Sequence, residues 1–192
     1  MTLEDRLGRQ LLIEGWDQAY LKDSPITIIG DNKVDTSLFV LSASALGIDN
    51  QIVICPELDP KIKEIANNLN EDLKLTHLEG YFNYIGLTNM LRQSKVIIDF
   101  TNYSLSKKLL LEYSYKTNTP VILTKLKDRD TEIFVYQRGR EYEELKRFVE
   151  LPSFNYNYSK DPVSALVQSG LVLELTKDIL MRKRVSEKII SH

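Results

Sequence analysis

The stretch ITIIGDNKVDTSLFVLSASALGIDNQIVIC, residues 26–55, decides the fold class of this chain. It opens with a β-branched run that ends at Gly30, continues with apolar residues at helical spacing over 35–46, and closes with a second β-branched run at 52–54. Apolar runs without polar alternation are typical of parallel strands that are buried on both faces. Strand, helix and strand in this order predict a βαβ unit with a right-handed crossover.

The rest of the chain repeats this alternation on both sides. Further helices are expected over 2–14, 60–69, 84–92, 104–117, 140–149 and from Asp161 to about Arg184. Further strands are expected over 73–77, 96–99, 120–124 and 133–136. The sequence therefore predicts an α/β protein with a Rossmann-like, mostly parallel sheet flanked by helices, including an N-terminal helix and a long C-terminal helix.

A chain of 192 residues has the size of one domain. Within it we expect an N-terminal helical arm over 1–24, a sheet core over 25–139 and a closing helix over 161–184. The closing helix begins with Asp161 and Pro162, a residue type that caps helices followed by one that is favoured at the first helical position.

Composition argues against several classes of function. The formal net charge of −2 disfavours a general nucleic-acid-binding surface, which needs a basic excess. The single cysteine, Cys55, excludes an internal disulfide and a cysteine-only zinc site, and it fits a reducing compartment. No apolar run is long enough to span a bilayer, and the first ten residues are not typical of a signal peptide. We expect a cytoplasmic protein with no nucleic-acid partner, no membrane partner and no zinc.

Polar residues follow three of the predicted strands at the point where each strand ends. They are Gly30-Asp31-Asn32, Cys55-Pro56-Glu57 and Asp99-Phe100-Thr101-Asn102. Ligands of open α/β sheets bind outside the carboxyl ends of the strands, near the point where the strand order reverses. The sequence therefore predicts that these three segments border one crevice.

Three separated stretches carry a family resemblance. The first, within residues 6–30, contains RLGRQLL, GWDQ, LKDS and IIG; the second is VIIDFTNY at 96–103; the third is the pattern of 161–177, with DPV, SG, E and K. In this order they resemble the ThiF/MoeB/HesA family of ubiquitin-activating-like adenylyltransferases. The resemblance implies adenylation of a carboxylate with ATP and magnesium, often at the C-terminal glycine of a ubiquitin-like or sulfur-carrier protein, and it implies dimerisation.

The turn after the first strand departs from the family pattern. The resemblance implies a glycine-rich turn there, because the backbone must approach the phosphates of ATP closely. Here the turn reads GDNKVD, in which only Gly30 matches. Asp31 and Asp35 add negative charge where the polyphosphate lies in the family, and Lys33 offsets part of it. A strand-to-helix turn without a ligand explains these residues better than a phosphate cradle does.

The segment after the second strand departs from the pattern as well. Cys55 aligns with the family's ribose-binding acid, and we interpret it as a small buried hydrophobe; Glu57 replaces the acid only if the loop is rearranged. The family's phosphate-holding stretch is absent, because the chain passes directly from Glu57 to a helix at Pro60. Either Lys61 or Lys63 corresponds to the family's phosphate-contacting lysine, or both are solvated helix lysines.

Two further positions complete the comparison with the family. Asn102 occupies the place of the magnesium-binding aspartate, where an amide oxygen can coordinate magnesium but brings no charge. Asp99 is retained, either as a hydrogen-bond acceptor at the turn or as a catalytic group. Arg9 matches an arginine that, in the family, reaches across a dimer to the partner's ATP, although Arg6 and Arg9 are equally well explained as exposed helix charges.

Four functions remain open at this point. We prefer a pseudoenzyme, a catalytically deficient or partner-dependent subunit of a homo- or heterodimer that donates Arg9, because several parts of the ATP site are altered together. The first alternative is an active ATP-dependent adenylyltransferase with a rearranged site built from Lys33, Glu57, Lys61 and Asn102. The others are a non-catalytic module that binds a carrier protein and, on weaker grounds, a Rossmann-like oxidoreductase.

Overall fold

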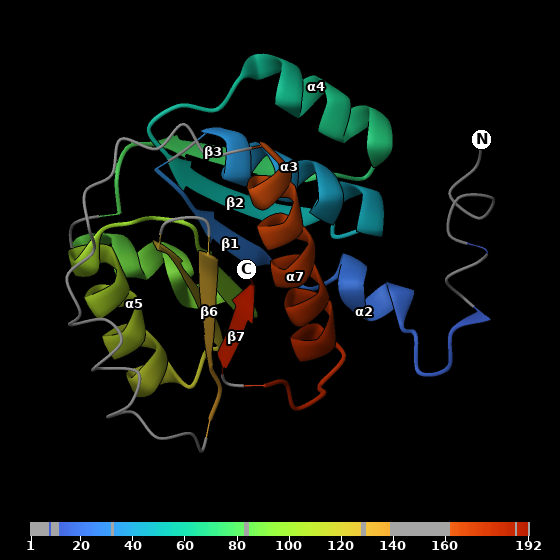
Figure 1. Cartoon of the computed structure of the whole chain (residues 1–192). Coiled ribbons are helices and arrows are strands. Elements are labelled where there is room, and N and C mark those ends of the chain that lie inside the picture. Colours follow the sequence, from blue (N-terminus) through green and yellow to red (C-terminus); the bar gives the residue numbers. More distant parts are fainter. Residues whose placement is uncertain are drawn as a thin grey trace.

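The chain folds into a seven-stranded sheet with helices on both faces (Figure 1). The structure is a computed structural model that describes residues 8, 12–31, 33–82, 85–127, 130–138, 162–186 and 188–191. The strands are β1 (Ile26–Ile29), β2 (Asn50–Cys55), β3 (Lys74–Glu79), β4 (Val96–Asp99), β5 (Val121–Lys127), β6 (Asp130–Tyr136) and β7 (Lys188–Ser191). The helices are α2 (Gln18–Lys22), α3 (Lys33–Leu46), α4 (Pro60–Leu69), the 3-10 helix η2 (Ile85–Gln93), α5 (Ser104–Thr117) and α7 (Pro162–Leu180).

The strand order is β3-β2-β1-β4-β5-β6-β7. The first five strands in this order are parallel, while β6 and β7 are antiparallel to their neighbours. The order reverses between β1 and β4, which is the switch point where ligands of such sheets bind. We call the end at which β1 to β5 finish the carboxyl end of the sheet, and the opposite one the amino end. The predicted α/β, Rossmann-like, mostly parallel fold with a long C-terminal helix is confirmed.

Alternate side chains of the buried strands supply the cores on the two faces, because successive side chains of a strand point in opposite directions. On one face Ile28 packs in a cluster with Phe39 of α3 and Val172 of α7. On the other face Ile29 packs with Leu110 of α5. Burial on both faces explains why the strand segments are continuously apolar.

The structure differs from the sequence prediction in a few places. It adds α2 and β7, which are too short for periodicity to reveal. It also places a 3-10 helix near the helix expected over 84–92. The expected helix over 2–14 lies mostly, and that over 140–149 entirely, outside the described residues. In the described part of the chain, no helix has both the length and the apolar character needed to cross a membrane.

Candidate functional site

The loops that follow β1 and β4 meet at the carboxyl end of the sheet. The backbone N–H of Phe100 donates to the carbonyl oxygen of Ile29, at an N···O distance of 2.8 Å. The backbone N–H of Asn102 donates to Oδ2 of Asp31, at 2.7 Å. The structure thus brings together two of the three segments that were predicted to border one crevice. Asp31 fastens them to each other, because a hydrogen bond to a carboxylate is stronger than one to a neutral acceptor.

Gly30 is explained by the packing of α3 on β1. A Cβ atom at this position would lie 2.0 Å from Oγ1 of Thr36 and 3.2 Å from its Cβ. Thr36 is completely buried in the first turns of α3, so it cannot turn away into solvent. The backbone N–H of Gly30 donates to the carbonyl oxygen of Ile54 at 3.0 Å. The glycine that matches the family's phosphate turn is therefore required by the fold itself.

The beginning of α3 carries the protein's own negative charge. Asp35 lies in the first turn of the helix and is completely buried, and Asp31 is half-buried in the turn that leads to the helix. A carboxylate is favourable there because the N-terminus of a helix has a partial positive charge. A bound phosphate would use the same feature. Lys33 begins the helix, but its side chain lies outside the described residues.

The end of β2 holds a contact that the sequence did not indicate. Cys55 is buried, and its Sγ lies 3.5 Å from Nε2 of His77, a residue of the neighbouring strand β3. The same nitrogen lies 3.0 Å from the carbonyl oxygen of Cys55. Burial raises the pKa of the Cys55 thiol to about 11, and a thiol that stays protonated is a poor nucleophile. The interpretation of Cys55 as a small buried side chain agrees with this environment.

A buried ion pair lies beneath the loop after β4. Nζ of Lys107, on α5, is 2.7 Å from Oδ2 of Asp99, and both side chains are at most 3% exposed. Oδ1 of Asp99 accepts from the backbone N–H of Thr101 at 3.1 Å, and its carbonyl oxygen accepts from Oγ1 of Thr124 at 3.0 Å. Both carboxylate oxygens of Asp99 therefore have structural partners. Lys107 continues the second stretch that carries the family resemblance, but residue spacing alone does not show that this lysine points into the protein.

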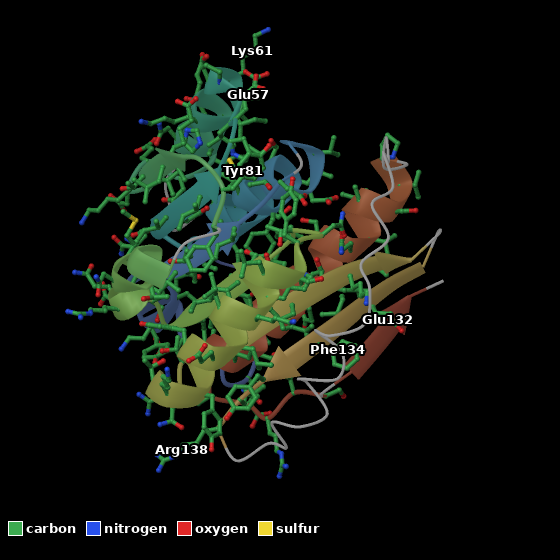
Figure 2. All side chains as sticks on the ribbon, turned by 90° about the vertical axis from the view of Figure 1, so that its left-hand side faces the viewer. Glu57, Lys61, Tyr81, Glu132, Phe134 and Arg138 are labelled. Carbon is green, nitrogen blue, oxygen red and sulfur yellow. The ribbon has the colours of Figure 1, made fainter. Side chains whose placement is uncertain are left out.

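The remaining candidates lie farther out. Glu57 and Lys61 are exposed, and Lys61 begins α4, where its backbone N–H donates to Oδ1 of the capping residue Asp59 at 2.9 Å. In Figure 2 the Lys61 side chain extends outward from the top of the molecule. Asn102 is half-buried. Arg9, the residue proposed to reach a partner, lies outside the described residues.

Two tyrosines stand at the rim of this end of the sheet. The rings of Tyr81, after β3, and Tyr103, after β4, meet edge to face with their centres 5.6 Å apart, and each residue is about half exposed. Desolvation, together with the neighbouring Tyr81 and Asp31, raises the pKa of Tyr103. The sequence analysis missed this pair, because the two residues come from different crossovers.

The resemblance implies that ATP and magnesium bind at this end of the sheet. Within the described ranges, no three or more His, Cys, Asp and Glu side chains are arranged to hold a metal ion. The carboxylates of Asp31 and Asp35 flank the turn that would hold the phosphates, and Asp99 is paired with Lys107. Like charges about 4 Å apart repel by about 4 kcal/mol at an effective dielectric constant of about 20. These residues are unfavourable for a triphosphate.

Comparison with known proteins supports the fold independently. No family model and no curated protein matches the sequence. Among solved structures, Escherichia coli MccB in complex with MccA is 12% identical, with a TM-score of 0.74 over 95% of this chain and 65% of MccB. PaaA is 15% identical, with a TM-score of 0.76 over 97% of this chain and 69% of PaaA. This chain thus spans about two thirds of the length of these neighbours. It has the fold of the ThiF/MoeB-like proteins MccB and PaaA, as the sequence resemblance predicted.

Proposed function

We propose that this chain is a degenerate ThiF/MoeB-type protein, a catalytically deficient or partner-dependent subunit in the activation of a ubiquitin-like or sulfur-carrier protein. One observation carries the proposal: the Asp31 carboxylate binds the Asn102 backbone at 2.7 Å, across the switch point where the family holds ATP. A carboxylate in this role stabilises the two loops without a ligand. It also repels the triphosphate that the family's glycine-rich turn attracts.

The altered positions support one another, which favours a loss of ATP binding over a single compensated change. The glycine-rich turn is reduced to Gly30 followed by Asp31, Cys55 replaces the ribose acid, and Asn102 replaces the magnesium aspartate. Each of these removes a different contact to the same ligand. Restoring tight binding would require replacements at several positions of one crevice at once.

The proposed partners are based on the family resemblance and on the molecules with which the structural neighbours were crystallised. MccB has been crystallised with MccA and with N-formylated MccA. We propose that this chain likewise binds a carrier protein. We also propose that it forms a dimer with a family member and that its Arg9 reaches the ATP bound by that partner. The proposal includes a cytoplasmic location, which rests on the single cysteine.

Calorimetric titration with ATP and magnesium tests the proposal. The isolated chain is expected to show no binding at the carboxyl end of the sheet, whereas a mixture with an active family member should bind ATP and depend on Arg9. The matched control is Arg9→Lys, which keeps the charge but loses the planar fork of donors. Tight ATP binding by the isolated chain that changes with Asp31→Asn would overturn the proposal.

An active adenylyltransferase with a rearranged site is the second candidate. The observation that favours it is the fold shared with MccB, which has been crystallised with ATP and with AMPCPP together with MccA. In this case Lys33, Glu57, Lys61 and Asn102 would make the nucleotide contacts. Exchange of labelled pyrophosphate into ATP that requires a carrier protein would establish this second function. Binding of a carrier without any exchange would leave a non-catalytic binding module.

A further inference from the structure

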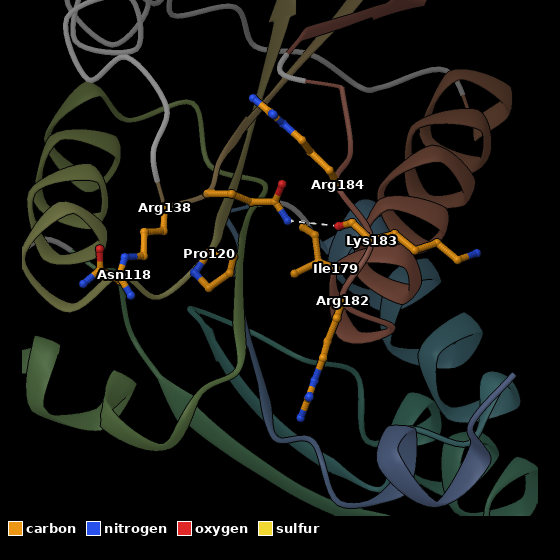
Figure 3. A pocket seen from close by; sticks show the side chains of 8 residues that line it. Asn118, Pro120, Arg138, Ile179, Arg182, Lys183 and Arg184 are labelled. Atoms are coloured by element: carbon orange, nitrogen blue, oxygen red, sulfur yellow. Dashed lines mark hydrogen bonds between the residues drawn. The ribbon is translucent and has the colours of Figure 1, made fainter. Parts of the chain in front are cut away.

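A second concave site lies at the amino end of the sheet, away from the crevice just described. It is a pocket of about 500 Å³ between the end of α5, the start of β5, the end of β6 and the segment after α7 (Figure 3). Figure 2 shows Arg138 at the opposite end of the molecule from Tyr81. We call this site the arginine pocket; it is lined by Asn118, Pro120, Gln137, Arg138, Ile179, Arg182, Lys183 and Arg184.

Four of these eight residues are cationic, although the chain as a whole has a formal charge of −2. Lys183 forms an ion pair with Asp178 at 3.2 Å, and Arg182 lies over the ring of Tyr20 at 5.2 Å from its centre. Within the described part of the chain, no carboxylate pairs with Arg138 or Arg184. Figure 3 shows the side chains of Arg138, Arg182 and Arg184 extending in different directions from the residues that line the pocket. The pocket therefore has a surplus of positive charge that its own residues do not neutralise.

The backbone is unusual at the same place. Among the described residues, Asn118 and Arg182 are the two non-glycine residues with a positive φ, each at 59°, and both line the pocket. Arg182 follows the end of α7, where its N–H donates to the carbonyl of Ile179 and the N–H of Lys183 donates to that of Asp178, each at 2.9 Å. Glycine is the favoured residue at this position of a helix end. Here a long cationic residue adopts this conformation instead, and such strain is concentrated at functional sites.

The segment after α7, which carries Arg182 and Arg184, is hydrogen-bonded to the end of a strand. Nε2 of Gln137 donates to the carbonyl oxygen of Lys183 at 3.4 Å, and Oε1 of Gln137 accepts from the N–H of Val185 at 3.5 Å. Gln137 follows β6 directly, so the segment after α7 is held against a strand end. The backbone that presents Arg184 is therefore fixed before any ligand binds, which lowers the entropic cost of binding.

We propose that the arginine pocket binds a compact oxyanion with at least two negative charges, such as a molecule with phosphoryl groups or several carboxylates. The planar guanidinium group of arginine can donate two parallel hydrogen bonds to the oxygens of a phosphoryl group or of a carboxylate, which a lysine cannot do. A concave shape with cations on several sides suits a small ligand rather than an extended polyanion. The proposal does not depend on the function of the carboxyl end of the sheet.

Calorimetric titration of the full chain with pyrophosphate at fixed ionic strength tests this site. We expect binding by the unaltered protein, about tenfold weaker binding by Arg138→Gln and by Arg184→Gln, and a larger loss in the double variant. The matched control is Arg92→Gln, which removes the same charge from an exposed arginine of η2 and should leave the affinity unchanged. Absence of binding, or equal weakening by Arg92→Gln, would overturn the proposal.

Three further measurements sharpen the result. Arg182→Gly keeps the left-handed turn and removes the charge, so a loss of pyrophosphate binding with an intact unfolding transition excludes misfolding as the cause. Citrate in place of pyrophosphate distinguishes a polycarboxylate ligand from a phosphoryl ligand. Titration of the double arginine variant with ATP distinguishes the two ends of the sheet. If the variant no longer binds ATP, the ATP was bound in the arginine pocket. If the variant still binds ATP, the proposed function of the carboxyl end is contradicted, but this inference is not.

Discussion

At the carboxyl end of the sheet the loops are held by carboxylates, and at the amino end the loops present arginines. The fold predicts a ligand at the first end, because strand order reverses there. Yet Asp31 already accepts a hydrogen bond from the backbone of Asn102, and Asp99 pairs with Lys107, so both carboxylates have partners within the protein. At the second end, Arg138 and Arg184 pair with no described carboxylate. The comparison teaches that topology shows where a family binds its ligand, while the balance of charge shows where a particular chain can bind one.

The largest expected effect comes from breaking the ion pair at the carboxyl end. Lys107→Met leaves the completely buried Asp99 carboxylate without its cation. Removing one partner of a buried pair costs about 3–5 kcal/mol. Urea denaturation should show this loss in the free energy of unfolding.

The control for this variant is Lys116→Met, which removes a lysine from the exposed pair with Glu112 on the same helix. That change should cost about 0.5 kcal/mol or less. A loss below about 1 kcal/mol in Lys107→Met would show that the carboxyl end is not organised around the ion pair.

The next effect tests whether packing alone requires Gly30. Gly30→Ala is expected to cost about 1–3 kcal/mol, because the new methyl group overlaps Oγ1 of Thr36. The matched control is Gly170→Ala in α7, where a Cβ meets nothing within 4 Å; it should stabilise the helix by about 0.5–1 kcal/mol. Thermal unfolding measures both. If Gly30→Ala costs as much in a Thr36→Ala background as in the natural one, the packing explanation is wrong.

A smaller effect is expected from Asp31→Asn. The hydrogen bond to the Asn102 N–H loses its charge, which should cost about 1 kcal/mol. Hydrogen exchange at the Asn102 amide should then become about fivefold faster. Asp59→Asn, at the N-cap of α4, is the control and should affect the Lys61 amide instead. Unchanged exchange at Asn102 would mean that Asp31 does not hold the two loops together.

The last prediction leaves the sequence unchanged. At pH 8 the buried thiol of Cys55 should react about a hundredfold more slowly than an exposed one, since its pKa is about 11 instead of 9.0. The unfolded chain loses this proton first, so stability should fall as the pH rises from about 9 to about 11 and stay unaffected below that range. Labelling with a thiol reagent and unfolding curves across this range measure both effects. Rapid labelling at neutral pH would indicate an accessible, reactive thiol instead.

Much of the fold could be predicted because it depends on local pattern. The largely apolar runs at 26–29 and 96–99 are buried strands, and Pro162 begins the closing helix. The antiparallel pair β5 and β6 was predicted as strands but not in its direction, because a strand's residue pattern does not encode which way its neighbour runs. The candidate site was less predictable. Alignment with the family's motifs shows which residues correspond, but it does not show which atoms each of these residues contacts.

By itself, the sequence determined the alternation of strands and helices and the charged and apolar character of each turn, because these depend on neighbours within a few residues. Only the tertiary structure decided which distant side chains meet. Asp31 reaches a backbone N–H 71 residues away, and Gln137 reaches a carbonyl 46 residues away. Such contacts depend on strand order and helix packing, which bury one lysine, Lys107, and leave an exposed arginine, Arg184, at the edge of a pocket. The physical reason is that a charge acquires its role from the partners and the solvent around it, and folding supplies both.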